Sequence, residues 1–284
     1  MLFIMNLMDL TSNNNDNNIS VYWINMEKSE KRRIRMENNT LSHSFFKKCN
    51  HIERIIGVDG EQCEEGKIMA CTRSHIKAIE TLSKSTNTFG FGLILEDDMT
   101  MDYFQYWESL TSNGHDYLSS IIDNAPDDWE ILQLCYISQS IPTILYENKK
   151  TNMEGVAGPG SSGGGHERYS TGAYLLRQST ANILMNRMKT LELTLQKYPE
   201  ADHYIYSLGN TYCYRFPIFT YKFWQMSTLH ENHEVFHNTS RQRIEQMYTL
   251  KRRMDEMIYF KMFFGSLAAC GLLAMYNVVV QINK

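Results

Sequence analysis

The stretch FGFGLILEDD (89–98) joins an uncharged, mostly apolar run to three consecutive carboxylates. The run has the length and composition of a strand buried on both faces of a sheet. The acids Glu96, Asp97 and Asp98 would then lie at the carboxyl end of that strand, where open α/β sheets bind their ligands. This stretch therefore predicts an α/β domain with a ligand site at one edge of its sheet.

The segments around this stretch alternate between strand-like and helix-like patterns. Short apolar runs rich in β-branched and aromatic residues predict strands, and apolar positions at helical spacing predict helices. Such alternation is typical of an α/β sandwich with a largely parallel sheet. The further strands are expected at 19–24, 51–60, 129–137, 142–146 and 171–176, and the helices at 27–38, 68–83, 102–122, 178–197 and 200–208.

Two other segments carry expectations of their own. Residues 212–219 predict an edge strand, because Pro217 has no backbone N–H and is excluded from central strands. Residues 147–168 hold six glycines and predict a long loop without secondary structure. Such a loop is either a lid over the active site or an insertion.

The overall composition excludes several classes of protein. With 43% hydrophobic and 21% charged residues over 284 positions, the chain is not wholly disordered, collagen-like or a coiled coil. A net charge of −4 disfavours nucleic-acid binding through bulk positive charge, so no nucleic-acid partner is expected. The six cysteines form no C-x-x-C pair, which argues against a zinc ribbon or a disulfide scaffold and favours a reducing compartment.

The two ends of the chain differ from its body. Residues 1–18 contain an asparagine-rich run and predict a disordered arm, and residues 241–261 predict a basic helical linker. Residues 262–280 are uncharged and span about 28 Å as a helix, roughly the thickness of a bilayer core. Because basic residues gather before this segment, we expect a single-pass C-terminal membrane anchor with the catalytic body, 19–240, in the cytosol. The alternative is a buried core helix, which Ser266 and Asn277 favour.

The carboxylate run has the spacing of a divalent-cation site. In a turn at a strand end, Glu96 and Asp98 can face the same way while Asp97 points aside. Mg²⁺ and Mn²⁺ prefer such a pair of carboxylates, completed by phosphate oxygens and water. Arg32 or Arg33, after the first strand, would reach the same edge, where a guanidinium matches a phosphate. The alternatives are an ordinary acidic turn and solvated charges on an exposed helix.

Several short motifs occur in a fixed order across residues 20–230. They are Ile24-Asn25-Met26 with Arg32-Arg33 and Met36, Asp59-Gly60, Cys71-Thr72-Arg73-Ser74-His75, Leu95-Glu96-Asp97-Asp98, Asp128-Trp129-Glu130-Ile131 with Leu134, Thr171-Gly172-Ala173-Tyr174-Leu175, Asp202, and Gln225 with Ser227. In this order the chain resembles glycosyltransferase family 25, which includes the lipooligosaccharide and procollagen galactosyltransferases. It departs from the family pattern at Ala70, where the family has glycine, and in the glycine-rich loop.

The resemblance implies a fold and a chemistry. The expected fold is a GT-A-type α/β/α sandwich with a largely parallel mixed sheet, to which the C-terminal transmembrane helix is added. The expected reaction is inverting transfer of galactose or glucose from a UDP-sugar, with Mn²⁺ or Mg²⁺, to the hydroxyl of a glycan or protein, as in lipopolysaccharide biosynthesis. In this scheme Glu96 and Asp98 bind the metal, and the donor is bound by Asn25, Arg32, Asp59, His75 and Asp97.

The general base is the least constrained role. Asp202 begins a predicted helix after Pro199, where an ionised side chain is favoured, and it is the candidate catalytic base. The alternatives are a residue that only orients the acceptor and a plain helix-capping acid. His75 on its apolar helix has the alternative of a core histidine, and His230, His233 and His237 are weaker metal candidates.

Three functions from different classes stay open at this point. The first is an active, membrane-tethered glycosyltransferase. The second is a catalytically inactive transferase-like domain that serves as an interaction module. The third is a metal-dependent phosphohydrolase or nuclease that uses the same carboxylates.

Overall fold

A computed structural model describes residues 19–86, 90–102, 117–123, 125–137, 153–155, 170–190, 199–214 and 217–221, and scattered helical positions between 242 and 266. Seven strands form the main sheet, in the order β2-β1-β3-β7-β5-β8-β6. The strands are β1 (Ile19–Asn25), β2 (His51–Ile56), β3 (Phe91–Glu96), β5 (Ile131–Gln133), β6 (Met153–Gly155), β7 (Ala173–Arg177) and β8 (Thr211–Tyr214).

The sheet is mixed, with one prevailing strand direction. β1 pairs in parallel with β2 and β3, and β5 pairs in parallel with β8. β7 is antiparallel to both β3 and β5, and β6 is antiparallel to β8. Five strands therefore run one way and β6 and β7 run the other. A separate two-stranded sheet joins β4 (Met99–Thr100) to β9 (Thr220–Tyr221).

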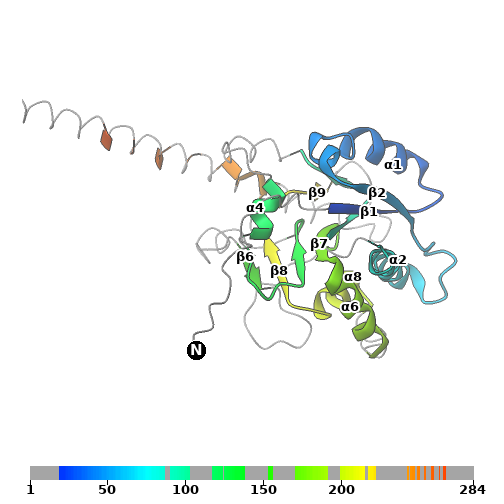
Figure 1. The fold of residues 1–284 in the computed structure, drawn as a ribbon. Helices are drawn as coiled ribbons and strands as arrows, with labels where there is room; N and C mark the ends of the chain where they lie inside the picture. Colours follow the sequence, from blue (N-terminus) through cyan, green and yellow to red (C-terminus); the bar gives the residue numbers. More distant parts are fainter. Residues whose placement is uncertain are drawn as a thin grey trace, which may run out of the picture.

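Helical segments lie on both faces of the main sheet (Figure 1). On one face, α2 (Gly66–Ser83), α6 (Gln178–Thr190) and α8 (Ala201–Ser207) share a core with the sheet. The other face carries α4 (Tyr117–Asp123), the π-helical turn η1 (Met36–Thr40) and the 3₁₀ turn η2 (Ser44–Lys48). The short helix α1 (Glu30–Arg35) precedes η1 and contributes no buried residue. The chain is therefore an α/β protein with a buried mixed sheet, as the sequence predicts.

The strands alternate their side chains between the two cores. In β3, Leu93 and Leu95 join the core of α4, η1 and η2, while Ile94 joins the core of α2, α6 and α8. Burial on both faces explains why β3 is a continuous apolar run in the sequence. Gly92 allows α2 to approach the sheet closely, since a Cβ at this position would lie only 2.3 Å from a methyl carbon of Leu82. These contacts fix the helix whose inner face carries His75.

The structure corrects two expectations. β8 lies between β5 and β6 rather than at the sheet edge, and it ends at Tyr214, before Pro217 is reached. The proline therefore takes no part in the ladder and does not restrict the position of the strand. The glycine-rich segment 147–168 is not entirely without secondary structure, because it contains β6, which pairs with β8.

Several expectations lie outside the described residues. They are the N-terminal arm 1–18, the strand at 142–146, most of the helical stretch 102–122 and most of the predicted anchor 262–280. No helix among the described residues is long and apolar enough to span a bilayer. The described positions of the predicted linker are helical, and Ile244 and Tyr248 are buried in the core, whereas Met257 and Ile258 are exposed. Met262, the first residue of the predicted anchor, is exposed as well.

Candidate active site

The candidate site lies at the edge where the parallel strands end. β1 ends at Asn25, and β3 beside it ends at Glu96, which pairs with Ile24 in the sheet register. β7 runs in the opposite direction, so the residues that precede it, 170–172, lie at the same edge. The backbone N–H of Glu96 donates to the carbonyl of Gly172 over 2.8 Å. Segments distant in the sequence thus meet around the three carboxylates.

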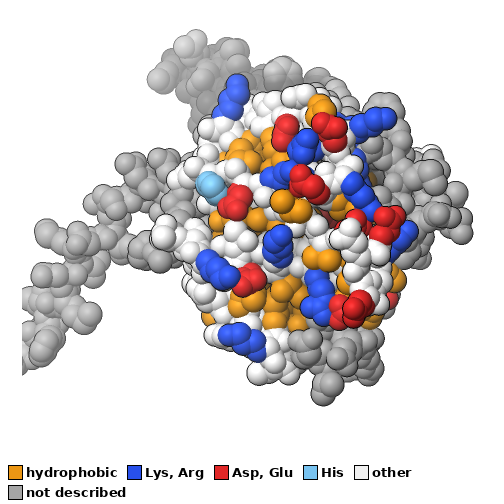
Figure 2. All heavy atoms as spheres, turned by 90° about the vertical axis from the view of Figure 1, so that its right-hand side faces the viewer, with side chains coloured by type: hydrophobic (Ala, Val, Ile, Leu, Met, Phe, Trp, Pro, Cys, Tyr) orange, Lys and Arg blue, Asp and Glu red, His pale blue; other side chains and the backbone are white. Residues whose placement is uncertain are grey.

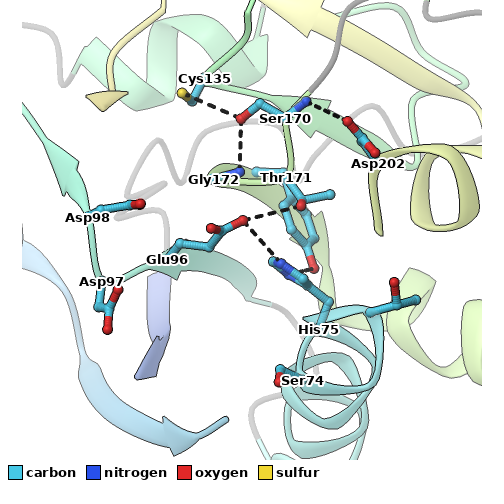
Figure 3. Close-up of polar contacts among 12 residues, drawn as sticks. Ser74, His75, Glu96, Asp97, Asp98, Cys135, Ser170, Thr171, Gly172 and Asp202 are labelled. Atoms are coloured by element: carbon cyan, nitrogen blue, oxygen red, sulfur yellow. Dashed lines mark hydrogen bonds and ion pairs between the residues drawn. The ribbon is translucent and has the colours of Figure 1, made fainter. Parts of the chain in front are cut away.

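Glu96 is held from two sides by hydrogen-bonding side chains. The hydroxyl of Thr171 donates to its Oε1 over 3.3 Å, and Nε2 of His75 lies 3.3 Å from the same oxygen (Figure 3). The other ring nitrogen of His75, Nδ1, lies 3.2 Å from the hydroxyl of Tyr174, which is fully buried. Burial opposes ionisation of Glu96, but the contact with His75 and the charge of Arg32 outweigh it and lower the pKa of Glu96. Glu96 is therefore an oriented, ionised carboxylate.

Asp97 points away from the other two acids and is used within the protein (Figure 3). Its Oδ2 accepts a hydrogen bond from the side-chain amide of Asn25 over 2.6 Å, and its Oδ1 lies 2.9 Å from Nη2 of Arg32. The side-chain oxygen of Asn25, Oδ1, accepts in turn a hydrogen bond from Nε of Arg54 over 3.0 Å. Burial raises the pKa of Asp97 above its ordinary value, against the effects of Arg32 and Asn25. Asp97 and Asn25 thus position Arg32 and the end of β1.

Asp98 contacts the same guanidinium, that of Arg32, as Asp97 does, but its own hydrogen-bonding capacity is only partly used. Its Oδ2 lies 2.8 Å from Nη2 of Arg32, and the two side chains are only 20% and 16% exposed. Among the described residues, the other oxygen, Oδ1, is buried and has no hydrogen-bond partner, and the same holds for Nε of Arg32. Burial, reinforced by Glu96 and Asp97 and opposed by Arg32, raises the pKa of Asp98 to about 7. One acceptor and one donor in the same ion pair are therefore left without a partner.

Unpaired buried polar atoms are costly, so each of them calls for an explanation. An unpaired carboxylate oxygen suits a cation, and an unpaired guanidinium N–H suits an anion. The two acids that face the same side are Glu96 and Asp98, and oxygen donors of this kind are what Mg²⁺ and Mn²⁺ prefer (Figure 3). The residues present therefore fit a divalent cation, and Arg32 beside it fits a phosphate.

The candidate base Asp202 lies across the turn that precedes β7. Its Oδ2 accepts from the backbone N–H of Ser170 over 3.1 Å (Figure 3). Its Oδ1 accepts from the backbone N–H of His203 over 3.2 Å. Ser170 has a φ of 103°, which is strained for a residue with a side chain. Its carbonyl accepts from the hydroxyl of Tyr206 over 2.7 Å and the amide of Gln133 over 2.9 Å. Asp202 thus helps to hold the turn that presents Thr171 to Glu96.

The structure does not bring every predicted donor-binding residue to the carboxylates. Asp59 follows β2 and pairs with Lys28 over 2.9 Å, and it also accepts from the backbone N–H of Glu61. None of its contacts reaches Glu96, Asp97 or Asp98. The candidate histidines His230, His233 and His237 lie outside the described residues.

Three residues of the site have no role in the prediction made from the sequence. They are Thr171 and Tyr174, which belong to β7 and the turn before it, and Cys71, which lies one helical turn before His75 on α2. The thiol of Cys71 is close enough to the site for burial and the charges of Glu96, Asp202 and Asp98 to raise its pKa well above the ordinary value. Cys71 and Thr171 both lie in motifs of the family resemblance, which is the signal that the sequence offered.

The face of the molecule that carries α1, β2 and α2 has no single sign of charge. Lysine and arginine side chains alternate there with aspartate and glutamate, and apolar side chains lie between them (Figure 2). Typical pairs are Lys28 with Glu61, Arg73 with Glu65 and Lys84 with Glu80. On this face the charges pair with one another rather than form a continuous basic surface.

No protein-family model matches this chain, and no similar sequence is found among curated proteins. The resemblance to glycosyltransferase family 25 therefore stays a prediction from its motifs.

Proposed function

We propose that the protein is a metal-dependent glycosyltransferase that moves galactose or glucose from a UDP-sugar to an acceptor hydroxyl with inversion. The mixed α/β sheet with helices on both faces supports the expected GT-A-type fold. The position of the carboxylates at the ends of parallel strands supports a ligand site at that edge. The alternatives are a catalytically inactive module and a phosphohydrolase, and no contact in the described residues favours either.

One observation carries the proposal, namely the incomplete ion pair of Asp98 and Arg32. Oδ1 of Asp98 and Nε of Arg32 are both buried, and no side chain or backbone group in the described part of the chain pairs with either. A nucleoside diphosphate with a bound divalent cation offers both missing partners, since the cation takes the carboxylate oxygen and a phosphate oxygen takes the N–H. An anion alone would pair with Nε of Arg32 but would leave the carboxylate oxygen of Asp98 without a partner.

The residues divide the work of the reaction between them. Glu96 and Asp98 would hold Mn²⁺ or Mg²⁺, which neutralises negative charge on the departing diphosphate. Arg32 supplies a second positive group to the same diphosphate, and Asn25 and Asp97 keep its guanidinium in place. His75 and Thr171 fix the carboxylate of Glu96, so that little reorganisation is needed when charge develops.

Inversion requires a base that removes the acceptor proton on the face opposite the leaving group. Asp202 is the proposed base. Each of its oxygens accepts one backbone N–H, and each keeps a second lone pair for an incoming hydroxyl. Its hold on Ser170 also makes it a positioning residue for the turn that carries Thr171.

The direct test is a panel of UDP- and GDP-sugars assayed for nucleotide release with Mn²⁺, with Mg²⁺ and with a chelator. We expect release from UDP-galactose or UDP-glucose that depends on the metal and rises when an acceptor is present. Glu80→Gln is the matched control, because Glu80 is paired with Lys84 on the surface of α2. No release from any donor would favour the inactive module. Cleavage of the donor's pyrophosphate bond by water, giving a nucleoside monophosphate and a sugar 1-phosphate, would favour the phosphohydrolase.

We also propose that residues 262–280 anchor the catalytic body at the cytosolic face of a membrane, which would give it lipid-linked or membrane-protein acceptors. The exposed apolar side chains Met257, Ile258 and Met262 support this proposal. A chain truncated after Glu256 should leave the membrane fraction and still release UDP. A glycan on Asn38, an exposed position in an N-x-T sequence, would show that the body faces the lumen instead.

A further inference from the structure

A second group of metal-binding side chains lies beside the carboxylates. The ligand atoms of Cys71, His75 and Glu96 all fall within 4.8 Å of one another. Cys71 and His75 are four residues apart on α2, so they lie on the same face of the helix. Glu96 reaches them from the end of β3. The three chemistries, thiol, imidazole and carboxylate, are the usual protein ligands of zinc.

The spacing of these atoms suits a tetrahedral ion. Nε2 of His75 and Oε1 of Glu96 are 3.3 Å apart. Two ligands bound at about 2.0 Å in a tetrahedron lie about 3.3 Å from each other, so this pair already has the required separation. Sγ of Cys71 lies no more than 4.8 Å from a ring nitrogen of His75 and from a carboxylate oxygen of Glu96. It needs to move by only about 1 Å, within reach of a small side-chain rotation.

The groups behind these ligands are also arranged as in a metal site. A histidine that binds a metal through one ring nitrogen usually hydrogen-bonds through the other, which fixes its tautomer and orientation. Here Nδ1 of His75 contacts the hydroxyl of the buried Tyr174 over 3.2 Å, so Nε2 is left to face Glu96. The carboxylate is oriented in the same way by the hydroxyl of Thr171 over 3.3 Å.

We propose that Cys71, His75 and Glu96 bind a thiophilic divalent cation such as Zn²⁺, with the fourth position open to water. Sulfur and imidazole ligands select zinc over Mn²⁺ and Mg²⁺, which prefer oxygen. Binding replaces the thiol proton with the metal, and the proton passes to solvent. This site is distinct from the pair formed by Glu96 and Asp98, although the two share Glu96.

The shared carboxylate gives the site a regulatory consequence, and this part of the inference rests on the proposed function. A cation held by Cys71 and His75 draws Glu96 away from the catalytic cation. Zn²⁺ should therefore inhibit UDP release at a fixed Mn²⁺ concentration, and Cys71→Ser should relieve the inhibition.

The binding itself is tested without any activity. The full chain is freed of metal with a chelator, kept reduced and titrated with Co²⁺, whose bond to a thiolate gives a charge-transfer band in the near ultraviolet. We expect a band that saturates at one Co²⁺ per chain and is displaced by Zn²⁺. It should be lost in Cys71→Ser or Cys71→Ala, and Thr171→Val should weaken binding roughly 10–100-fold.

The control is Cys63→Ser, which removes a thiol in the loop before α2 that contacts Glu65 rather than His75. This variant should keep the band. Absence of a band in the folded wild-type chain, or a band that persists in both Cys71 variants, would overturn the proposal. Asp98→Asn should lose metal-dependent UDP release but keep the band, so the thiophilic site and the glycosyltransferase proposal can fail independently.

Discussion

The two halves of the candidate site differ in how completely their polar groups are satisfied. In the half built around Glu96, the carboxylate, His75, Thr171 and Tyr174 contact one another and leave no buried side-chain nitrogen or oxygen without a partner. In the half built around Asp98, one oxygen of the carboxylate and one nitrogen of Arg32 are buried and find no partner within the described ranges. The first half is arranged in advance, and the second leaves one acceptor and one donor for a ligand.

This difference separates positioning from binding. When one member of a satisfied network is removed, the remaining side chains keep most of its arrangement, because they still hydrogen-bond to one another. An unsatisfied pair loses its ligand when either member is removed, because nothing else offers the missing partner. Substitutions in the Asp98 half should therefore affect activity far more than substitutions in the Glu96 half that spare the carboxylate itself.

The largest effect is expected from Asp98→Asn. The amide keeps the size of the side chain but removes a negative charge from the cation site, so UDP release should fall about 10²–10³-fold. A UDP-release assay at saturating Mn²⁺ measures this, with Glu80→Gln as the unchanged control. Near-normal turnover by a folded Asp98→Asn protein would remove Asp98 from the metal site.

Arg32→Lys should have the next largest effect. Lysine keeps the positive charge but lacks the planar guanidinium. In Arg32 this group contacts Asp97 and Asp98 through Nη2, and its Nε is available to a phosphate. We expect KM for the UDP-sugar to rise about tenfold or more, with a smaller change in kcat. The split between the two constants is the readout. A loss of similar size in kcat, with KM unchanged, would mean that Arg32 contacts the diphosphate only in the transition state.

Thr171→Val tests the satisfied half with an almost isosteric change. It removes one hydrogen bond to Glu96 and leaves the contact with His75 in place. A neutral hydrogen bond contributes about 0.5–1.5 kcal/mol, so kcat/KM should fall about two- to tenfold. Loss of a hundredfold or more would mean that Thr171 contacts the substrate, and the contrast between the two halves would fail.

The smallest effect concerns stability and pH. The pKa of Asp98 is about 7 in the folded protein against an ordinary value of 3.8, so the folded state holds a proton that the unfolded state has already released. Between about pH 4 and 7 this group therefore makes the metal-free protein less stable as the pH rises. The amide of the Asp98→Asn variant does not titrate. Thermal melts of metal-free protein should show this variant gaining a few degrees on the wild type across this range, and a constant difference would contradict the raised pKa.

The sequence predicted the parts of this site that depend on local pattern. The apolar run before Glu96 made β3 recognisable, and the acid-x-acid spacing predicted that Glu96 and Asp98 face one side while Asp97 points aside (Figure 3). Helical spacing likewise predicted α2, the helix on which the buried His75 lies. These features repeat over a few residues, so a short window contains them.

The remaining parts depend on contacts between distant segments. Asn25 and Asp97 are 72 residues apart, and Thr171 and Glu96 are 75 apart, so no local pattern encodes either hydrogen bond. The position of β8 was predicted wrongly for a related reason, since Pro217 was assigned to a strand that ends three residues earlier. Asp59 shows the limit of a motif, because its neighbours Lys28 and Glu61 hold it away from the carboxylates.

The central claim is that the Asp98 half of the site is completed by a cation together with a diphosphate. Calorimetric titration of the full chain with UDP, with and without Mn²⁺, tests this most directly. We predict UDP binding that is at least about tenfold tighter with Mn²⁺, and a dependence on Mn²⁺ that disappears in Asp98→Asn but persists in Cys71→Ser. UDP binding that is equally strong with and without Mn²⁺, or a dependence on Mn²⁺ that survives Asp98→Asn, would contradict the claim.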